Sequence, residues 1–305
     1  MSSQSRHPVE TVLIAANPKS GSKSRFELVT ELEHRIGSLG YRCEVITQLD
    51  ELERRAQILY GDRELRAVVA AGGDGTISAV AQRTPSDVPL RILPLGSENL
   101  LANYLSISRK PIDCAEAVHR NQIRQMDGMD VGGRLAFVMA SVGFDAEVVR
   151  RVHQSRKSHI TRWAYRYSAL AAWILYGWPA FSIRIHHVEN NVVQTFEGTS
   201  RWCFVFNVPR YATGLSLLPD SDPSDGLLNV GYFERSGRIR GIFQYLQVLR
   251  GNHRSKKHWR DCLGSEVQLC NCQKGKAPQF QYDGDWGGVL PVSIRILARR
   301  LKLVI

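Results

Sequence analysis

The first part of the chain alternates short apolar runs with stretches in which apolar residues recur at helical spacing. The apolar runs predict strands at residues 11–16, 41–47, 68–71 and 90–94. The stretches between them predict helices at residues 24–38 and 51–60, and a third helix that begins near residue 77. Strands that alternate with helices in this way are typical of an α/β fold with a doubly wound parallel sheet.

The pattern changes near residues 125–130, where shorter runs begin in which apolar and polar residues alternate. These runs predict strands at residues 135–140, 181–187, 203–208, 227–233, 266–270 and 292–297. Helical stretches interrupt them near residues 146–177 and 239–250. We therefore predict an α/β domain at residues 1–127 and an antiparallel β-sandwich domain at residues 128–305, and leave open whether the last residues return to the first domain.

The most informative stretch follows the third predicted strand. Gly72, Gly73 and Gly75 surround Asp74, and Thr76 comes next. A glycine-rich turn between a strand and a helix presents free backbone N–H groups and a helix N-terminus to phosphate. Glycine suits such a turn because a Cβ atom would keep the phosphate away from the backbone. An ordinary turn rarely needs this combination, so we predict a phosphate-binding loop.

Two more polar loops follow predicted strands. Asn17, Lys19 and Gly21 come after the first strand, and Gly96 and Ser97 come after the fourth. In open parallel sheets the ligand binds outside the carboxyl ends of the strands. We therefore expect both loops to contact the same ligand as the glycine loop.

Composition narrows the class of protein. A hydrophobic content of 43% and a charged content of 23% are those of a soluble globular protein. The net charge of +11 suits an anionic partner, such as a nucleotide, a nucleic acid or an acidic membrane surface. The start of the chain has no apolar segment of a signal peptide, and six scattered cysteines favour reduced thiols in a cytosol.

One apolar stretch, residues 163–181, raises the question of membrane contact. It contains Arg166 and is closed by Gly177 and Pro179, so it is too interrupted to predict a spanning helix. A packed helix is the first interpretation, and a helix that touches the membrane surface is the alternative. The basic residues from Arg250 to Arg260 are equally compatible with a solvated loop and with contact to anionic headgroups.

Two acidic turns lie in the second half of the chain. Asp222 and Asp225 belong to a loop of turn-forming residues, which fits a solvated turn and an Mg²⁺ site equally well. Asp283 and Asp285 flank a single glycine, which predicts a hairpin turn. Two acids in this arrangement also suit a base with a metal or hydroxyl partner.

Taken together, these motifs resemble the diacylglycerol kinase catalytic family, which includes sphingosine kinases and bacterial lipid kinases. The motifs are, in chain order, Asn17-Pro18 with Gly21, Gly72-Gly73-Asp74-Gly75-Thr76, Pro94-Leu95-Gly96-Ser97-Glu98-Asn99, Val142-Gly143-Phe144-Asp145-Ala146, Asp225-Gly226-Leu227-Leu228, Gly251-Asn252-His253 and Asp283-Gly284-Asp285. The resemblance covers nearly the whole chain. It implies a nucleotide-binding domain like those of NAD kinases and phosphofructokinases, a β-sandwich domain for the lipid substrate, and an active site in the cleft.

The resemblance also implies an activity and its residues. The activity is ATP-dependent phosphorylation of a lipid hydroxyl, with Asp283 or Asp285 as the proton acceptor. The implied ATP contacts are Asn17, Lys19, Thr47, Gly72, Gly73, Asp74, Gly75, Thr76, Gly96, Ser97 and Asn99. An Mg²⁺ ion is implied at the Asp225 carboxylate, with main-chain oxygens near Asp222 and Leu227.

Three places depart from the family pattern. Tyr211-Ala212-Thr213-Gly214 replaces a run richer in glycine. Glu98 replaces a small residue, and Asp285 replaces a glutamate that is one methylene longer. They leave open a non-catalytic nucleotide- or lipid-binding regulator of the same fold, and an NAD kinase-like enzyme is a further alternative. The expected setting is cytoplasmic, with peripheral contact to a membrane that holds the lipid substrate. No nucleic-acid partner is expected, and a homodimer is left open.

Overall fold

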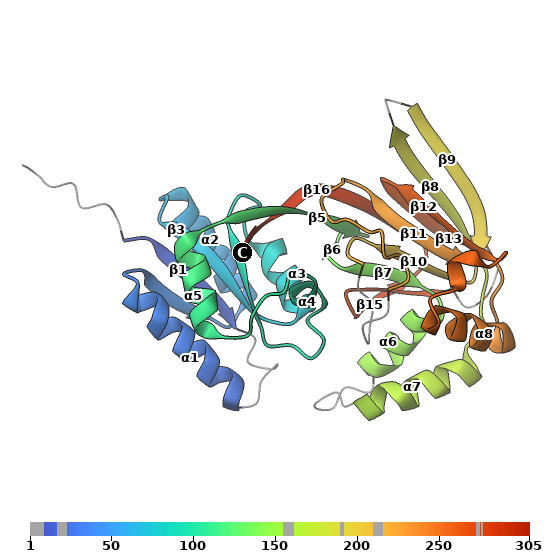
Figure 1. The fold of residues 1–305 in the computed structure, drawn as a ribbon, viewed down its shortest axis with the longest axis horizontal. Helices are drawn as coiled ribbons and strands as arrows, with labels where there is room; N and C mark the ends of the chain where they lie inside the picture. The colour runs from blue at the N-terminus through green and yellow to red at the C-terminus, as the bar shows by residue number, and fades with distance from the viewer. Residues whose placement is uncertain are drawn as a thin grey trace, which may run out of the picture. The chain divides into compact units, whose positions relative to one another are not determined.

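The computed structural model describes residues 9–16, 23–154, 162–189, 192–209, 216–272, 275 and 277–305. The chain forms two compact units (Figure 1). Unit 1 comprises Met1–Met126 together with Arg299–Ile305, and unit 2 comprises Asp127–Ala298. The predicted α/β nucleotide-type domain and antiparallel β domain correspond in class to these two units.

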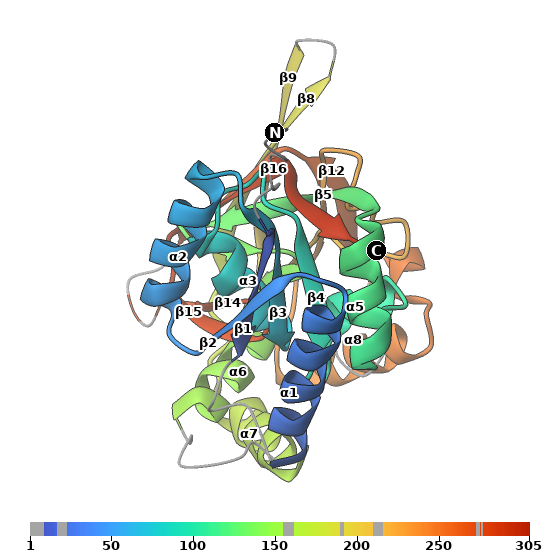
Figure 2. The same ribbon diagram turned by 90° about the vertical axis from the view of Figure 1, so that its left-hand side faces the viewer.

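Unit 1 is a parallel sheet covered by helices. Its elements are β1 (Thr11–Ala16), α1 (Lys23–Ser38), β2 (Arg42–Ile46), α2 (Leu49–Gly61), β3 (Leu65–Gly72), α3 (Asp74–Arg83), β4 (Leu90–Pro94), α4 (Leu100–Tyr104) and α5 (Pro111–Arg120). The strands run parallel in the order β2-β1-β3-β4. Helices α2 and α3 lie on one side of this sheet and α1 and α5 on the other (Figure 2). The sheet is therefore doubly wound, as the alternating pattern predicted.

The helical spacing of α1 accounts for the core of unit 1. Val29, Leu32 and Ile36 recur on one helix face and are buried against the strands. Val12 and Ile14 of β1 meet them from the sheet and are fully buried. Burial of such side chains contributes about 1.5–3 kcal/mol each, so this face fixes α1 against the sheet.

In its described residues, unit 2 is built from antiparallel strands, three α-helices and a short 3₁₀ helix. Its elements are β5 (Ile123–Val131), β6 (Leu135–Ala136), β7 (Met139–Val142), α6 (Phe144–Gln154), α7 (Arg162–Leu175), β8 (Phe181–Glu189), β9 (Val192–Ser200), β10 (Trp202–Phe206), β11 (Leu228–Phe233), α8 (Arg238–Leu249), the 3₁₀ helix η3 (His253–Ser255), β12 (Trp259–Gly264), β13 (Glu266–Asn271), β14 (Gln279–Tyr282), β15 (Asp285–Val289) and β16 (Val292–Val304). Strands β5 and β16 each extend from one unit into the other.

Two antiparallel sheets face each other in unit 2. One has the order β12-β11-β10-β7-β14-β15, and the other contains β16-β13-β8-β9. Val205 and Val230 of the first sheet share one buried core with Ile183 and Val267 of the second. Alternate residues of the strands therefore fill the space between the sheets, which is the packing of a β-sandwich.

The structure corrects two predicted elements of unit 2. The single helical stretch predicted at residues 146–177 is two helices, α6 and α7. The strand predicted at residues 135–140 is divided into β6 and β7, because the amides of Phe137 and Val138 bind a carboxylate instead of a neighbouring strand. Within the described residues, no helix has the length and apolar character needed to cross a membrane.

The outer face of the first sheet carries an aromatic cluster. Trp202 and Phe204 of β10 alternate with core residues and point to this face, where both are buried. The ring of Phe144 at the start of α6 lies 5.7 Å from that of Trp202 and 5.0 Å from that of Trp173 in α7. Ring pairs at these distances are favourable beyond their burial, so the cluster attaches the helices to the sheet.

Candidate active site

The glycine loop of unit 1 is shorter than the sequence predicted. Helix α3 begins at Asp74, three residues before the predicted start, and Gly73 is the residue that precedes it. The N–H of Thr76 donates to the carbonyl of Gly73 at 2.9 Å. A Cβ atom on Gly72 would lie 2.3 Å from Oγ1 of Thr76. A side chain at position 72 is therefore excluded by the first turn of the helix.

The glycine loop packs directly against the loop that follows β4. A Cβ atom on Gly96 would lie 2.5 Å from Cα of Gly73, so the two backbones touch. Asn99 fixes the second loop, since its Oδ1 accepts from the N–H of Gly96 at 2.9 Å and its Nδ2 donates to the carbonyl of Gly96 at 2.8 Å. Asn99 itself adopts a left-handed backbone, with φ of 49°. The two predicted phosphate loops are thus brought together at the carboxyl edge of the sheet.

Asp74 connects the two loops through hydrogen bonds. Its carboxylate accepts from the N–H groups of Leu100 and Leu101 at 2.9 and 3.0 Å, at the start of α4. Burial raises the pKa of the Asp74 carboxyl, and the two amide hydrogen bonds oppose that rise. Asp74 and Asn99 were predicted as ATP contacts, and in the structure their polar atoms bind the protein's own backbone.

The remaining predicted ATP contacts are not joined to the two loops by such hydrogen bonds. Gly75 is the second residue of α3 and is half-buried, and Ser97 is exposed on the loop after β4. Thr47 is exposed, directly after β2, which is the outer neighbour of β1. Asn17 and Lys19 lie outside the described residues, directly after the end of β1.

The Asp283 turn of unit 2 is a hairpin turn, as the sequence predicted. Asp283 and Gly284 both have positive φ, 44° and 83°, and connect β14 to β15. The Asp283 carboxylate accepts from the N–H groups of Phe137, Val138 and Met139 at 2.8, 2.9 and 3.0 Å. Asp283 therefore fixes the segment between β6 and β7, while Asp285 is half-buried as the first residue of β15.

A chain of buried hydrogen bonds holds this turn in place. The N–H of Gly284 donates to Oε1 of Gln281 at 3.0 Å, and Nε2 of Gln281 donates to Oγ of Ser141 at 2.7 Å. Ser141 in turn donates to Asp145, which also accepts from the indole of Trp202 at 2.9 Å. Burial raises the pKa of the Asp145 carboxyl. The chain joins the Asp283 turn to the aromatic cluster.

Sequence analysis found Asp145 through its motif but missed Ser141 and Gln281. Both are almost fully buried in strands β7 and β14, at 1% and 2% exposure. Both alternate with core residues of their strands and therefore lie on the outer face of the sheet, with Trp202 and Phe204. A polar residue beside the motif residues of such a strand is the only signal that the sequence offers for this partner. Gln281 immediately precedes the turn at Tyr282-Asp283, so its position along the strand was available in the sequence.

A carboxylate on strand β5, which sequence analysis missed, contacts the predicted metal turn. Oδ2 of Asp127, 1% exposed on β5, accepts from the N–H of Gly226 at 2.7 Å. Oδ1 of Asp225 accepts from the N–H of Leu227 at 2.8 Å. Partial burial raises the pKa of Asp225, and the charges of Asp222 and Asp127 raise it further. A cation beside Asp225 would offset this repulsion.

The described side chains do not form a metal cage at this turn. No group of three acidic, histidine or cysteine side chains among the described residues is placed to share an ion. Oδ1 of Asp222 is engaged by the N–H and the hydroxyl of Ser224, at 3.0 and 2.6 Å. Among the described residues, the turn therefore offers the Asp225 carboxylate without a cluster of carboxylates around it.

His253 of the Gly-x-His motif has a structural position. It is 2% exposed, and its ring lies 4.8 Å from that of Trp259 in an edge-on contact. Its Nε2 lies 2.9 Å from the carbonyl of Leu217, in the segment that leads to the acidic turn. Burial lowers the pKa of His253, which favours the neutral ring.

Family models match both parts of the chain. The family model for the diacylglycerol kinase catalytic domain matches residues 11–131, and that for the YegS C-terminal NAD kinase beta sandwich-like domain matches residues 138–305. A diacylglycerol kinase of Bacillus subtilis is 27% identical over 79% of this chain and 78% of its own length. A diacylglycerol kinase of Mycobacterium tuberculosis is 24% identical over 98% of this chain and 96% of its own.

Solved structures show the same fold at lower identity. A diacylglycerol kinase from Bacillus anthracis is similar with a TM-score of 0.65 at 12% identity, covering 97% of this chain and 96% of that chain. Another solved chain from that organism gives a TM-score of 0.72 at 15% identity, covering 100% and 98%. At these identities the likeness concerns the fold alone.

Proposed function

This chain belongs to the diacylglycerol kinase catalytic-domain family, and from that premise we propose that it transfers the γ-phosphate of ATP to a hydroxyl group of a lipid. The observation that carries the proposal is the contact between the Gly73 and Gly96 loops, which the hydrogen bonds of Asp74 stabilise. Because both loops are fixed before any ligand arrives, their backbone groups are preorganised for a polyphosphate.

The nucleotide side of the site depends on backbone more than on side chains. Phosphoryl transfer needs positioning and charge stabilisation rather than covalent chemistry from the protein. We assign the N–H groups at the start of α3 and the exposed Ser97 to the phosphates of ATP. Asn17, Lys19 and Thr47 are proposed as further ATP contacts. Asp74 and Asn99 act as positioning residues, because their polar atoms hold the loops.

For the proton acceptor, the geometry favours Asp285 over Asp283. The carboxylate of Asp283 already accepts hydrogen bonds from three backbone amides, so its oxygens are engaged within the protein. Asp285 is half-buried at the adjacent strand start. We propose that Asp285 accepts the proton of the lipid hydroxyl and that Asp283 fixes the turn that carries it.

We propose that Mg²⁺ binds at the acidic turn of unit 2. Asp225 would supply the carboxylate, and main-chain oxygens near Asp222 and Leu227 the remaining protein ligands. When bound, Mg²⁺ would neutralise negative charge at this turn, where burial and then the charges of Asp222 and Asp127 raise the pKa of Asp225.

Exposed apolar side chains support peripheral contact with a lipid surface. Tyr167 and Leu170 of α7 are 71% and 59% exposed, and Phe243 of α8 is 60% exposed. Aromatic and aliphatic side chains of this kind favour the boundary between water and lipid. A lipid kinase must meet its substrate at such a boundary, so we assign α7 and α8 to that contact.

The function is tested by incubating the protein with ATP labelled at the γ-phosphate, Mg²⁺ and a panel of lipids. Diacylglycerol and a sphingoid base are offered separately, and NAD serves as a water-soluble acceptor. The proposal expects label in the organic phase with at least one lipid. Transfer to NAD instead, or ATP binding without transfer to any lipid, would refute it and favour an NAD kinase-like enzyme or a non-catalytic regulator.

A further inference from the structure

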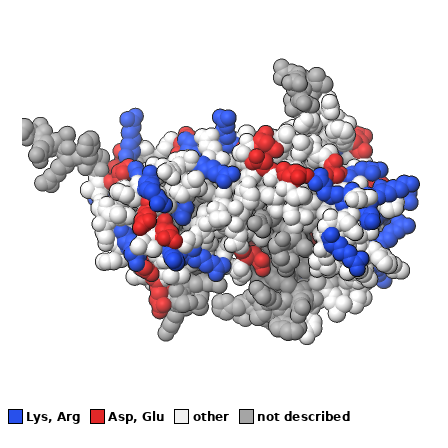
Figure 3. Space-filling view, viewed as in Figure 1, with Lys and Arg blue, Asp and Glu red and all other residues white. Residues whose placement is uncertain are grey.

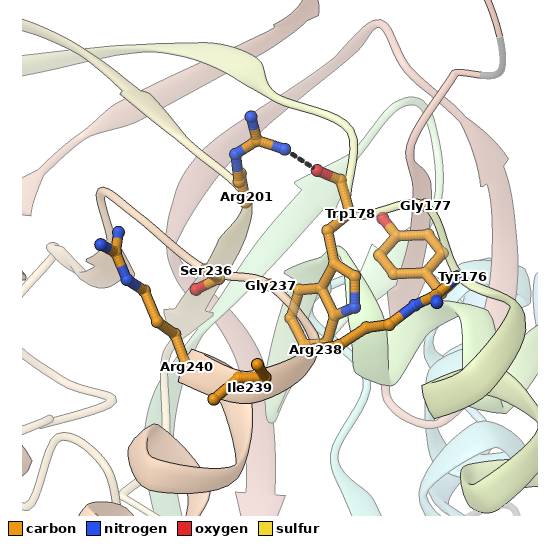
Figure 4. Close-up of a pocket in the computed structure, with 9 residues that line it drawn as sticks. All are labelled: Tyr176, Gly177, Trp178, Arg201, Ser236, Gly237, Arg238, Ile239 and Arg240. Carbon is orange, nitrogen blue, oxygen red and sulfur yellow. Dashed lines mark hydrogen bonds between the residues drawn. The ribbon is translucent and has the colours of Figure 1, made fainter.

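A cavity of about 470 Å³ opens within unit 2 between the end of α7 and the start of α8 (Figure 4). Tyr176 and Trp178 line it from the segment after α7, and Arg201 lines it from the turn between β9 and β10. Arg238 and Arg240 complete it from the first turn of α8. None of the catalytic or nucleotide-binding residues assigned above belongs to this cavity.

The cavity is lined by hydrogen-bond donors and carries positive charge. Three arginines contribute guanidinium groups, and no acidic residue lines the cavity. Among the ion pairs of the described residues, none involves Arg238 or Arg240. Arg201 donates to the main-chain carbonyl of Trp178, as Figure 4 shows, which holds that backbone in place. An anion is therefore the ligand that this lining favours.

Two buried donors in the lining have no partner. The hydroxyl of Tyr176 and the indole N–H of Trp178 are buried without a hydrogen bond, in side chains that are 4% and 3% exposed. An indole N–H can only donate, so its partner must be an acceptor. A buried donor without a partner is costly, so an acceptor oxygen that reached either group from the cavity would stabilise it. A phosphate group has such acceptor oxygens, and its negative charge also matches the arginines.

The start of α8 adds backbone donors to the same cavity. Gly237 precedes the helix and supplies no side-chain cap, so the first N–H groups have no capping partner from that residue. Ser236 is turned away, since its hydroxyl donates to Oε1 of Gln244 at 2.7 Å. The positive end of a twelve-residue helix thus reinforces the arginines.

Exposed apolar residues adjoin this cavity on both helices. Ile174 and Leu175 at the end of α7 are 54% and 65% exposed. Ile239, in the cavity wall, is 74% exposed. Lys and Arg side chains gather over the part of unit 2 that carries α8 (Figure 3). A phosphate carried on acyl chains would match both the donors and the apolar rim.

We propose that this cavity binds the phosphate headgroup of an anionic membrane phospholipid whose acyl chains lie against α7 and α8. This site goes beyond the proposed phosphoryl transfer, because the bound lipid is neither phosphoryl donor nor acceptor. It would hold unit 2 to an acidic membrane and orient α7 and α8 on its surface. Each arginine near such a surface contributes about fivefold in affinity.

Vesicle sedimentation tests the site without relying on catalysis. Vesicles of phosphatidylcholine are compared with vesicles that also contain phosphatidylserine, whose headgroup has no hydroxyl and so cannot accept a phosphoryl group. The wild-type protein should bind the second kind, and the double variant Arg238→Gln/Arg240→Gln should bind about 25-fold more weakly. The variant Arg63→Gln/Arg120→Gln removes the same charge from exposed positions in unit 1 and should bind like wild type.

Equal binding by the two double variants would overturn the proposal, since total charge would then explain the attraction. Trp178→Phe keeps an aromatic ring and removes the indole donor, so it should weaken binding to the phosphatidylserine vesicles. Wild-type affinity in that variant would overturn the role of the unpartnered donors. Calorimetry with inorganic phosphate forms the second arm: binding of free phosphate lost in Arg238→Gln/Arg240→Gln, with vesicle binding retained, would assign the site to a soluble anion instead.

Discussion

We expect substitution of Asp285 to affect catalysis and substitution of Asp283 to affect stability. We expect Asp285→Asn to lower phosphoryl transfer by about 10²–10⁴-fold, as for loss of a general base, with ATP binding unchanged. Asp283→Asn should instead destabilise the fold by about 1–3 kcal/mol, because an amide NH₂ would face backbone donors now bound by the carboxylate. Transfer assays and urea unfolding measure the two effects.

Asparagine tolerates the left-handed backbone at position 283, where φ is 44°, so the substitution changes the hydrogen bonds without adding backbone strain. Turnover of Asp285→Asn within a few-fold of wild type would contradict the assignment of the base. Unchanged unfolding free energy in Asp283→Asn would contradict the structural role of the three amides.

The contact between the two loops of unit 1 makes Gly96 sensitive to a single methyl group. In Gly96→Ala the new Cβ would meet Cα of Gly73 at 2.5 Å and Oδ1 of Asn99 at 2.6 Å. The loops must then move apart, and we expect ATP affinity to fall by about 10- to 100-fold in calorimetry. Gly37→Ala is the matched control, because nothing lies within 4 Å of its Cβ in helix α1. It should leave ATP affinity unchanged and stabilise the helix by about 0.5–1 kcal/mol.

At the scale of residues, the sequence marked the two loops that the structure brings into contact, but not the partners of their side chains. The glycines after β3 marked the loop correctly because backbone geometry restricts which residue fits there. The sequence did not reveal that Asp74 binds the amides of Leu100 and Leu101, since that contact joins residues 26 and 27 positions apart. Asp127 was missed for the same reason, because its partner Gly226 is brought to it only by the fold.

At the scale of elements, helices and strands with a strong hydrophobic pattern could be predicted from the sequence, and those with a weak pattern could not. Strands β1, β3 and β4 were predicted because each contains a short run of buried apolar residues. Helix α5 was missed, since its buried face consists largely of small residues such as Cys114 and Ala115. Strand β9 was missed because its described side chains are mostly exposed, so that pairing with β8 rather than burial defines it.

The stability that the acidic turn before β11 contributes should depend on both Mg²⁺ and pH. Folding raises the pKa of Asp225, so the folded state binds the proton more tightly than the unfolded state. Stability from this group is therefore greatest at low pH and falls as pH rises above about 4, the unfolded value. We expect Mg²⁺ to offset that loss at neutral pH and to raise the melting temperature.

Asp225→Asn provides the comparison, because it removes the charge that Mg²⁺ would neutralise. Its melting temperature should vary less between pH 4 and 7, and Mg²⁺ should no longer raise it. Differential scanning calorimetry with and without Mg²⁺ measures both effects. An equal Mg²⁺ response in the variant and the wild type would place the ion elsewhere. Asp220→Asn, at an exposed neighbour, controls for general loss of acidic charge.

At the scale of the whole molecule, the end of the chain completes the unit in which the chain begins. Leu303 of β16 pairs in parallel with Leu90 of β4, so the last strand extends the sheet of unit 1. Side chains of unit 1 also bind this segment: Arg91 donates to the carbonyl of Val304 at 2.9 Å, and Asp87 pairs with Lys302 at 2.6 Å. Unit 1 is therefore discontinuous in sequence.

A buried residue near the C-terminus should accordingly control the stability of unit 1. Leu303 is 0% exposed, whereas Ile305, two residues later, is 42% exposed. We expect Leu303→Ala to lower the unfolding free energy by about 2–5 kcal/mol through the cavity it creates, and to weaken ATP binding because β4 leads into the Gly96 loop. Ile305→Ala should change stability by less than about 0.5 kcal/mol, since the hydrogen bond from its N–H to Gln122 uses only backbone atoms. Urea unfolding and ATP calorimetry on both variants test this prediction. Equal changes in unfolding free energy and ATP affinity in the two variants would show that the buried side chain of Leu303 does not stabilise unit 1. A large decrease in both quantities confined to Leu303→Ala would show that the nucleotide loops depend on strand β16.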